Sequence, residues 1–266
     1  MSKRDEIRDR VGATGKPVVL VEGPDDEAAF TTLLGRFLPG WDQGWAMASA
    51  GKKSEVIELL RLEPTWLGIV DRDEWDSATI TRQQAALPNL LVLPRFSLES
   101  YLVVPSELWR ALPTLQQDRI PGEQAALEAA IVAVLPPYLR HGALWKVVTP
   151  LWTGLRALGF KEALASEQSV GVAQDNTEIQ RVLGEWDALL DPQRIFTDFQ
   201  AELQAAQQAS LHDQLTLWVH GKVFWNQGVH PVLNGFLGQA SASDRRTRLL
   251  KGIPQPSDLQ SLLARI

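Results

Sequence analysis

Short apolar runs alternate with amphipathic stretches along the first hundred residues. The run Val18-Val19-Leu20-Val21 is β-branched and bounded by proline and glycine, so it predicts a strand. From Asp25 to Leu38 apolar side chains recur every four positions, which predicts a helix. A second helix is expected after Gly51, and further strands are expected over residues 45–50, 66–71 and 89–93. Apolar strands that alternate with helices are typical of a parallel sheet covered on both faces.

The pattern changes near residue 105, after which only helical periodicity is found. Helices are predicted over residues 106–112, 123–135, 151–164, 177–190 and 198–206. Prolines are expected to end or separate these helices, among them Pro136, Pro137 and Pro150. The predicted fold class is therefore α/β, with a Rossmann-like parallel sheet and flanking helices over residues 1–105. An all-helical C-terminal region, residues 106–266, is expected to fold back and close the site.

Composition excludes several classes of protein. Of the 266 residues, 45% are apolar and 22% are charged, which excludes a disordered chain. The absence of cysteine excludes a disulfide-stabilised miniprotein. No apolar run reaches the roughly 20 residues that cross a bilayer, and the N-terminus is charged. We expect a cytoplasmic protein with no membrane partner.

Acidic residues stand where the predicted strands end. Glu22 ends the first strand, and Asp71 and Asp73 follow the third. Alternation along a strand predicts that Asp71 and Asp73 share one face. Ser97 and Glu99 repeat this spacing after the fourth strand. Because sites in parallel sheets form beyond the carboxyl ends of the strands, we expect these acids to converge.

Converging carboxylates need a positive charge between them if they are to stay ionised. Oxygen ligands without histidine or cysteine suit Mg²⁺ or Mn²⁺, so either ion is the expected cofactor. The four histidines lack the spacing of a zinc site. The stretch Gly51-Lys52-Lys53-Ser54 does not match a phosphate-binding P-loop, because the first glycine and the serine or threonine after the first lysine are missing. No ATPase site is therefore expected in the chain itself.

These motifs resemble a TOPRIM domain, in which one strand ends in Glu-Gly and a later strand ends in Asp-x-Asp. The matching residues are Glu22-Gly23 and Asp71-Arg72-Asp73. The finer resemblance is to nucleases of the OLD (overcoming lysogenization defect) family and to stand-alone TOPRIM effectors of anti-phage systems such as PARIS. It includes Asp26, Gly51-Lys52, the segment from Pro94 to Leu102, and Gly221-Lys222. Ser100 stands where that family usually has asparagine.

The resemblance implies a role for each matching residue. Glu22 would bind metal or act as general acid or base, and Asp71 and Asp73 would bind metal. Asp26 and Glu99 would help to hold a second metal ion, with Ser97 beside it. Lys222 would stabilise charge on the scissile phosphate.

The expected function is Mg²⁺- or Mn²⁺-dependent endonucleolytic hydrolysis of a phosphodiester, with tRNA and DNA both open as substrates. The resemblance further implies an anti-phage defence effector, a toxin held by an ABC-type ATPase partner, and a possible homodimer. The alternative is a catalytically inactive TOPRIM module that binds metal and regulates a nucleic-acid complex. Two features of the sequence favour this alternative, namely Ser100 and the net charge of −6. Nucleotidyl transfer, as in primases, is disfavoured because the chain has no room for a further nucleotide-binding domain.

Overall fold

Four short parallel strands form a single sheet in the computed structural model, which describes residues 3–12, 15–166, 169 and 171–266. The strands are β1 (Val18–Val21), β2 (Ala46–Ser49), β3 (Leu67–Val70) and β4 (Leu90–Val92). Their order across the sheet is β2-β1-β3-β4, and every neighbouring pair is parallel. All residues of β1 and β3 are buried, as expected for central strands of a sheet with two covered faces. The predicted parallel sheet is confirmed.

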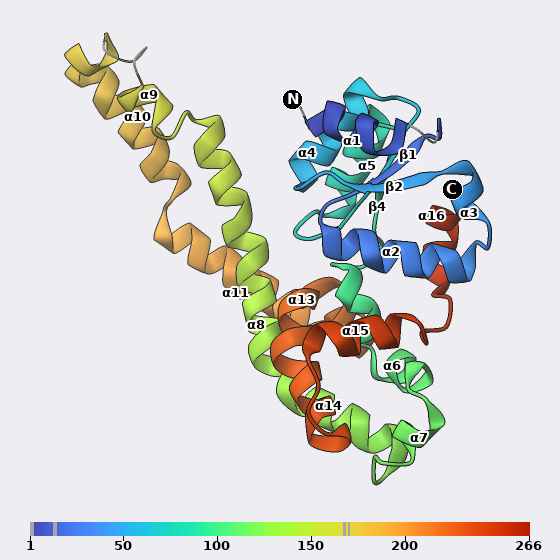
Figure 1. Ribbon diagram of the computed structural model, residues 1–266. Helices are drawn as coiled ribbons and strands as arrows, with labels where there is room; N and C mark the ends of the chain where they lie inside the picture. The colour runs from blue at the N-terminus through green and yellow to red at the C-terminus, as the bar shows by residue number, and fades with distance from the viewer. Residues whose placement is uncertain (1–2, 13–14, 167–168, 170) are drawn as a thin grey trace.

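Side-chain alternation along the strands creates two apolar layers. Val18 and Leu20 face one layer, where they pack with residues of α1 (Lys3–Gly12) and α4 (Lys53–Leu62). Val19 and Val21 face the opposite layer, which contains α2 (Pro24–Phe37) and much of the C-terminal region. Figure 1 shows α2 on the side of the sheet that faces the C-terminal helices. Helix α5 (Ser77–Ala86) connects β3 to β4. Met1 and Ser2, the start of the charged N-terminal segment, lie outside the described residues.

The rest of the described chain is helical, apart from turns and connecting segments. A five-residue 3₁₀-helix, η1 (Leu98–Leu102), follows the sheet. Two short π-helical stretches flank Lys222, namely η4 (Gln214–Trp218) and η5 (Trp225–Val229). The α-helices here are α6 (Pro105–Ala111), α7 (Thr114–Gln117), α8 (Glu123–Ala157), α9 (Glu162–Ala165), α10 (Asn176–Leu189), α11 (Pro192–Gln208), α12 (Leu211–Asp213), α13 (Gly221–Phe224), α14 (His230–Leu237), α15 (Ala242–Leu250) and α16 (Gln260–Leu263). A four-residue helix, α3 (Trp41–Gly44), precedes β2.

Helix α8 corrects one prediction, because it continues through three of the prolines that were expected to end or separate helices. Pro136, Pro137 and Pro150 lie inside a single helix of 35 residues. Proline removes a backbone hydrogen bond and normally kinks or ends a helix. Here buried apolar residues recur every four positions across the first two prolines, and their packing outweighs that local cost. These buried residues are Leu127, Ile131, Leu135, Leu139 and Ala143.

Beyond Trp145 and Lys146, which still contact His220 and Trp218, α8 leaves the body of the protein. Its distal half, α9, α10 and the start of α11 extend away from the sheet, and α11 returns along α8 (Figure 1). We call the described residues of this part, 147–166, 169 and 171–196, the helical arm. In the described part of the chain, none of the helices combines the length and the apolar character that crossing a bilayer requires.

The sheet and the C-terminal helices share one apolar core. Val19 and Ile69 of the sheet belong to the same buried cluster as Leu127 of α8 and Trp225 of η5. The chain end also returns to the N-terminal part, where the Trp45 indole Nε1 donates a hydrogen bond to the Ile266 carbonyl oxygen at 2.7 Å. The boundary at residue 105 stays a prediction, and it falls within a continuous core.

Candidate carboxylate site

The acidic residues singled out from the sequence lie at the carboxyl edge of the sheet. Glu22 follows β1 directly and Asp71 follows β3 directly. The Asp71 backbone N–H donates to Glu22 Oε1 at 3.0 Å, and the Leu98 N–H donates to Asp71 Oδ1 at 3.1 Å. These two bonds connect the ends of β1 and β3 to η1. The three segments that carry the sequence motifs therefore meet at one place.

A turn after β3, and not the alternation of side chains along the strand, brings Asp73 to the site. Strand β3 ends at Val70, and Asp73 adopts a left-handed backbone conformation with φ of 51°. Its N–H donates to the Phe96 carbonyl oxygen at 2.8 Å, which fixes this turn against the segment after β4. The expectation that two strand positions present both acids on one face is wrong in its geometry. A turn places Asp73 near Asp71 instead.

Lys53 faces Asp73 and compensates part of the acidic charge. Its Nζ lies 2.7 Å from Asp73 Oδ2 and 4.5 Å from the centre of the Trp75 ring. Lys53 is the first residue of α4, which begins at the carboxyl end of β2. Lys52, the lysine of the Gly-Lys motif, is exposed. The second lysine of this stretch, rather than the first, contacts the carboxylates.

Asp26 closes the first turn of α2 and lies among the charged groups of the site. Its Oδ2 accepts a hydrogen bond from the Gly23 N–H at 3.0 Å, which closes the first turn of the helix. Burial raises the pKa of Asp26, and the Glu99 carboxylate raises it further. Lys222 and Arg246 lower the same pKa, so both cations lie close enough to act on this carboxyl.

Ser97, Glu99 and Arg246 form a buried polar cluster. The Ser97 hydroxyl donates to Glu99 Oε2 at 3.1 Å, and Arg246 Nη1 donates to Glu99 Oε1 at 2.6 Å. Arg246 lies on α15, 147 residues along the chain from Glu99. Its Nη2 also lies 3.8 Å from Asp25 Oδ2. This cluster joins the C-terminal region to the carboxyl edge of the sheet.

Lys222 lies at the rim of the same site. It lines a small cavity of about 80 Å³ together with Asp25, Glu99 and Arg246. The neighbouring Gly221 allows this approach, because a Cβ there would lie 2.4 Å from Ser97 Oγ. Close packing against Ser97 therefore explains the glycine of the Gly221-Lys222 pair. The lysine of the pair lies beside the carboxylates.

Crowding of like charges shifts the pKa values of the central acids. Burial raises the pKa of Glu22, and the Lys53 ammonium partly opposes this rise. Burial also raises the pKa of Asp71 well above its ordinary value. Neighbouring carboxylates raise the Asp71 pKa further, in the order Asp73, Asp26, Glu22 and Glu99. The four other acids named from the sequence thus all act electrostatically on Asp71.

The donor chemistry of the site fits a hard divalent cation, but the side chains are not arranged around one. The oxygens available are those of five carboxylates and the Ser97 hydroxyl, the donors that Mg²⁺ and Mn²⁺ prefer. The mutual repulsion at Asp71 is what a bound cation relieves. Among the described residues, however, no three histidine or acidic side chains are grouped so that they could hold a metal ion. Lys53 and Arg246 instead neutralise Asp73 and Glu99.

Sequence reasoning missed three residues of this site. Lys53 was identifiable, because it follows a strand at the same edge of the sheet as the acids. Arg246 was visible only as part of a basic run, and nothing in that run indicates Glu99 as its partner. His220 is the third: its ring lies 5.1 Å from that of Phe96, and burial lowers its pKa while Asp73 opposes this shift.

No protein-family model matches the chain, and none of the curated proteins matches it either. The functional argument below therefore starts from the residues of the carboxylate site.

Proposed function

We propose that this protein is a Mg²⁺- or Mn²⁺-dependent endonuclease. The observation that carries the proposal is the meeting of Glu22, Asp26, Asp71, Asp73 and Glu99 at the carboxyl edge of a parallel sheet. Ligand sites of open parallel sheets form at this edge. The resemblance of the same residues to the TOPRIM pattern supports the same function.

The residues of the site suit the steps of phosphodiester hydrolysis. Glu22, Asp26, Asp71, Asp73, Ser97 and Glu99 would hold one or two divalent cations. Such a cation supplies positive charge that stabilises the transition state at a phosphate. Glu22, whose pKa is raised by burial, is suited to accept a proton from the attacking water near neutral pH. Lys222, at the rim beside Glu99, would neutralise a non-bridging phosphate oxygen.

The substrate in this proposal is nucleic acid, either tRNA or DNA. The resemblance to OLD nucleases supports DNA, and the resemblance to stand-alone anti-phage effectors supports tRNA. The same resemblance supports a role in defence under the control of an ABC-type ATPase partner, since the sequence has no P-loop of its own.

A cleavage assay tests the proposal. The purified chain is incubated with plasmid DNA and with total tRNA, in Mg²⁺ or Mn²⁺ and in EDTA. Cleavage is expected to fall at least about 100-fold in Glu22→Gln and in Asp73→Asn. The matched control Asp187→Asn, an exposed acid of α10, is expected to cleave at the wild-type rate. Equal rates in wild type, Glu22→Gln and Asp73→Asn would refute the proposal.

The alternative function is a catalytically inactive module that binds metal and regulates a complex. The pairing of Asp73 with Lys53 and of Glu99 with Arg246 favours it, because these cations already neutralise two of the carboxylates. Calorimetry with Mn²⁺ beside the cleavage assay separates the two functions. Both predict Mn²⁺ binding that Asp71→Ala abolishes, but only the nuclease cleaves, alone or with its ATPase partner.

A further inference from the structure

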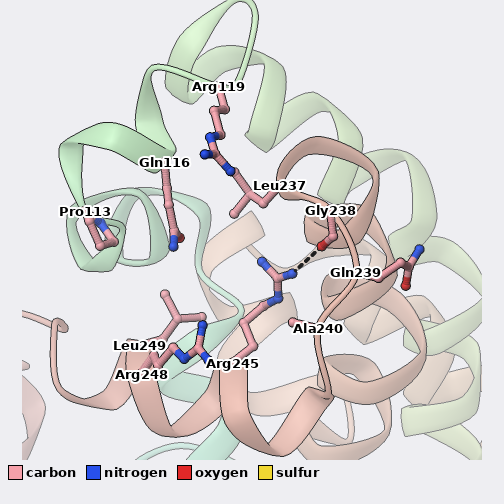
Figure 2. Close-up of a pocket in the computed structure, with 10 residues that line it drawn as sticks. All are labelled: Pro113, Gln116, Arg119, Leu237, Gly238, Gln239, Ala240, Arg245, Arg248 and Leu249. Carbon is pink, nitrogen blue, oxygen red and sulfur yellow. Dashed lines mark hydrogen bonds between the residues drawn. The ribbon is translucent and has the colours of Figure 1, made fainter.

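A second pocket lies behind α15, away from the carboxylate site. Figure 2 shows its lining, which comes from the α7 region, the turn after α14, and α15. Its volume is about 360 Å³, which lies in the range of small-molecule sites. Arg245 and Arg248 of α15 line this pocket, whereas Arg246 between them pairs with Glu99. One face of α15 therefore lines this pocket, and another face contacts the carboxylate site.

The pocket is strongly basic. Arg119, Arg245 and Arg248 line it, and none of its described lining residues is acidic. Within the described residues, no carboxylate forms an ion pair with any of these three arginines. In Figure 2 the Arg119 and Arg245 guanidinium groups extend toward one another from opposite sides. Three uncompensated cations around one hollow favour an anionic ligand.

Arg245 is held in place but has an unused hydrogen-bond donor. Its side chain is only 7% exposed, and its Nη2 donates to Asn234 Oδ1 at 2.9 Å and to the Gly238 carbonyl oxygen at 2.8 Å. Its Nε is buried and has no hydrogen-bond partner among the described residues. Burial lowers the pKa of Arg245, and the Arg248 charge lowers it further. Burying a guanidinium N–H without a hydrogen-bond acceptor costs free energy. A ligand that brings an acceptor atom to this N–H would remove that cost.

We propose that this pocket binds a small molecule that carries a phosphate group beside an apolar or aromatic part. The phosphate would lie among Arg119, Arg245 and Arg248, since guanidinium groups bind phosphate through paired hydrogen bonds. Leu237 and Leu249 supply apolar lining for the other part of the ligand. A nucleoside monophosphate has both features. This inference stands apart from the proposed nuclease function, because no residue of the carboxylate site lines this pocket.

Binding of AMP to the full chain at low ionic strength tests the proposal, with adenosine and inorganic phosphate as separate probes. Calorimetry is expected to detect AMP but not adenosine, because the phosphate carries the charge. Arg119→Gln and Arg248→Gln change exposed arginines and leave the buried Arg245 intact. Each is expected to weaken AMP binding about three- to tenfold. Lys251→Gln, an exposed cation directly after α15 and outside the pocket, is expected to bind AMP as wild type does.

Three results would overturn the proposal. The first is that AMP does not bind at a concentration of about 5 mM. The second is that the Arg119→Gln/Arg248→Gln double variant binds AMP as tightly as wild type. The third is that single-stranded oligonucleotides bind, whereas neither AMP nor inorganic phosphate does. Glu22→Gln separates the two sites. If it abolishes cleavage and leaves AMP binding unchanged, both proposals are supported. If it abolishes AMP binding, the ligand occupies the carboxylate site and the pocket proposal fails.

Discussion

Asp71 is the residue on which the electrostatic repulsion of the carboxylate site concentrates. It is buried, and the carboxylates that surround it all raise its pKa. An acid whose folded pKa is raised contributes stability below its unfolded pKa and loses that contribution as pH rises through the folded value. The contribution of Asp71 to the stability of the metal-free protein therefore falls as pH rises above about 4, the ordinary pKa of aspartate.

Asp71→Asn is expected to stabilise the metal-free protein by about 1–3 kcal/mol at neutral pH, because it removes the buried charge. The amide oxygen can still accept the hydrogen bond from the Leu98 N–H. The measurement is the melting temperature in EDTA between pH 4 and pH 8, and the advantage of the variant should grow with pH. An advantage that is constant across this range would show that charge at Asp71 is not its cause.

Lys53 is expected to compete with a divalent cation for Asp73, since its Nζ lies 2.7 Å from that carboxylate. Lys53→Met removes the competing charge and should tighten Mn²⁺ binding about five- to tenfold by calorimetry. Lys52→Met, at the exposed neighbouring position, is the matched control and should change the affinity little. Weaker Mn²⁺ binding in Lys53→Met would mean that Lys53 holds Asp73 in the geometry that the ion needs.

Among the elements, the short helix α13 depends on a glycine for its place beside η1. A Cβ at Gly221 would lie 2.4 Å from Ser97 Oγ and 3.0 Å from the Ser100 backbone nitrogen. Gly221→Ala should therefore cost about 1–3 kcal/mol of stability and move Lys222 away from the site. Gly235→Ala on α14 has no atom within 4 Å of its new Cβ and should be neutral or slightly stabilising. Urea unfolding of both variants checks this, and equal stabilities would contradict it.

Helix α15 is fixed to η1 by the buried Arg246–Glu99 pair. Arg246→Met leaves the Glu99 carboxylate buried without its main partner, so we expect a loss of about 3–5 kcal/mol. Adding Glu99→Gln should restore at least about 1 kcal/mol in a double-mutant cycle. Arg248→Met, an exposed position of the same helix, should change stability little. If Glu99 binds metal, Mn²⁺ should stabilise Arg246→Met more than wild type, and an equal effect would exclude Glu99 as a ligand.

The sheet and the acids could be predicted from the sequence because both depend on local patterns. Apolar runs define the strands, and the parallel order places their ends at one edge, where Glu22 and Asp71 meet. The turn at Asp73 was not predictable, because its left-handed backbone depends on the Phe96 carbonyl far along the chain. Arg246 was missed for the same reason. Long-range contacts also let α8 continue through Pro136 and Pro137, where local propensity predicted an end.

At the scale of the whole molecule, α8 connects two parts of very different packing. Its first half buries Leu127 and Ile131 in the core that the sheet and C-terminal helices share. In the helical arm, Leu155 is the one buried residue of α8 among those described, and Trp152 is 56% exposed. Contacts between aromatic rings connect the helices of the arm, with Phe160 5.0 Å from Trp186. An element with few buried contacts opens locally at a lower free energy than the core.

Hydrogen exchange should therefore separate the two halves of this one helix. Amides at residues 147–157 and in α10 are expected to exchange at least about 100-fold faster than those at residues 127–139. The first half of α8 is the internal control, because it belongs to the same helix and differs in burial; Pro136 and Pro137 have no amide hydrogen and are left out of the comparison. Phe160→Ala should speed exchange in the arm further and leave residues 127–139 unchanged, since it removes the contacts with Trp152 and Trp186. Equal protection along the whole of α8 would mean that the arm is covered in solution, by a second copy of the chain or by another partner.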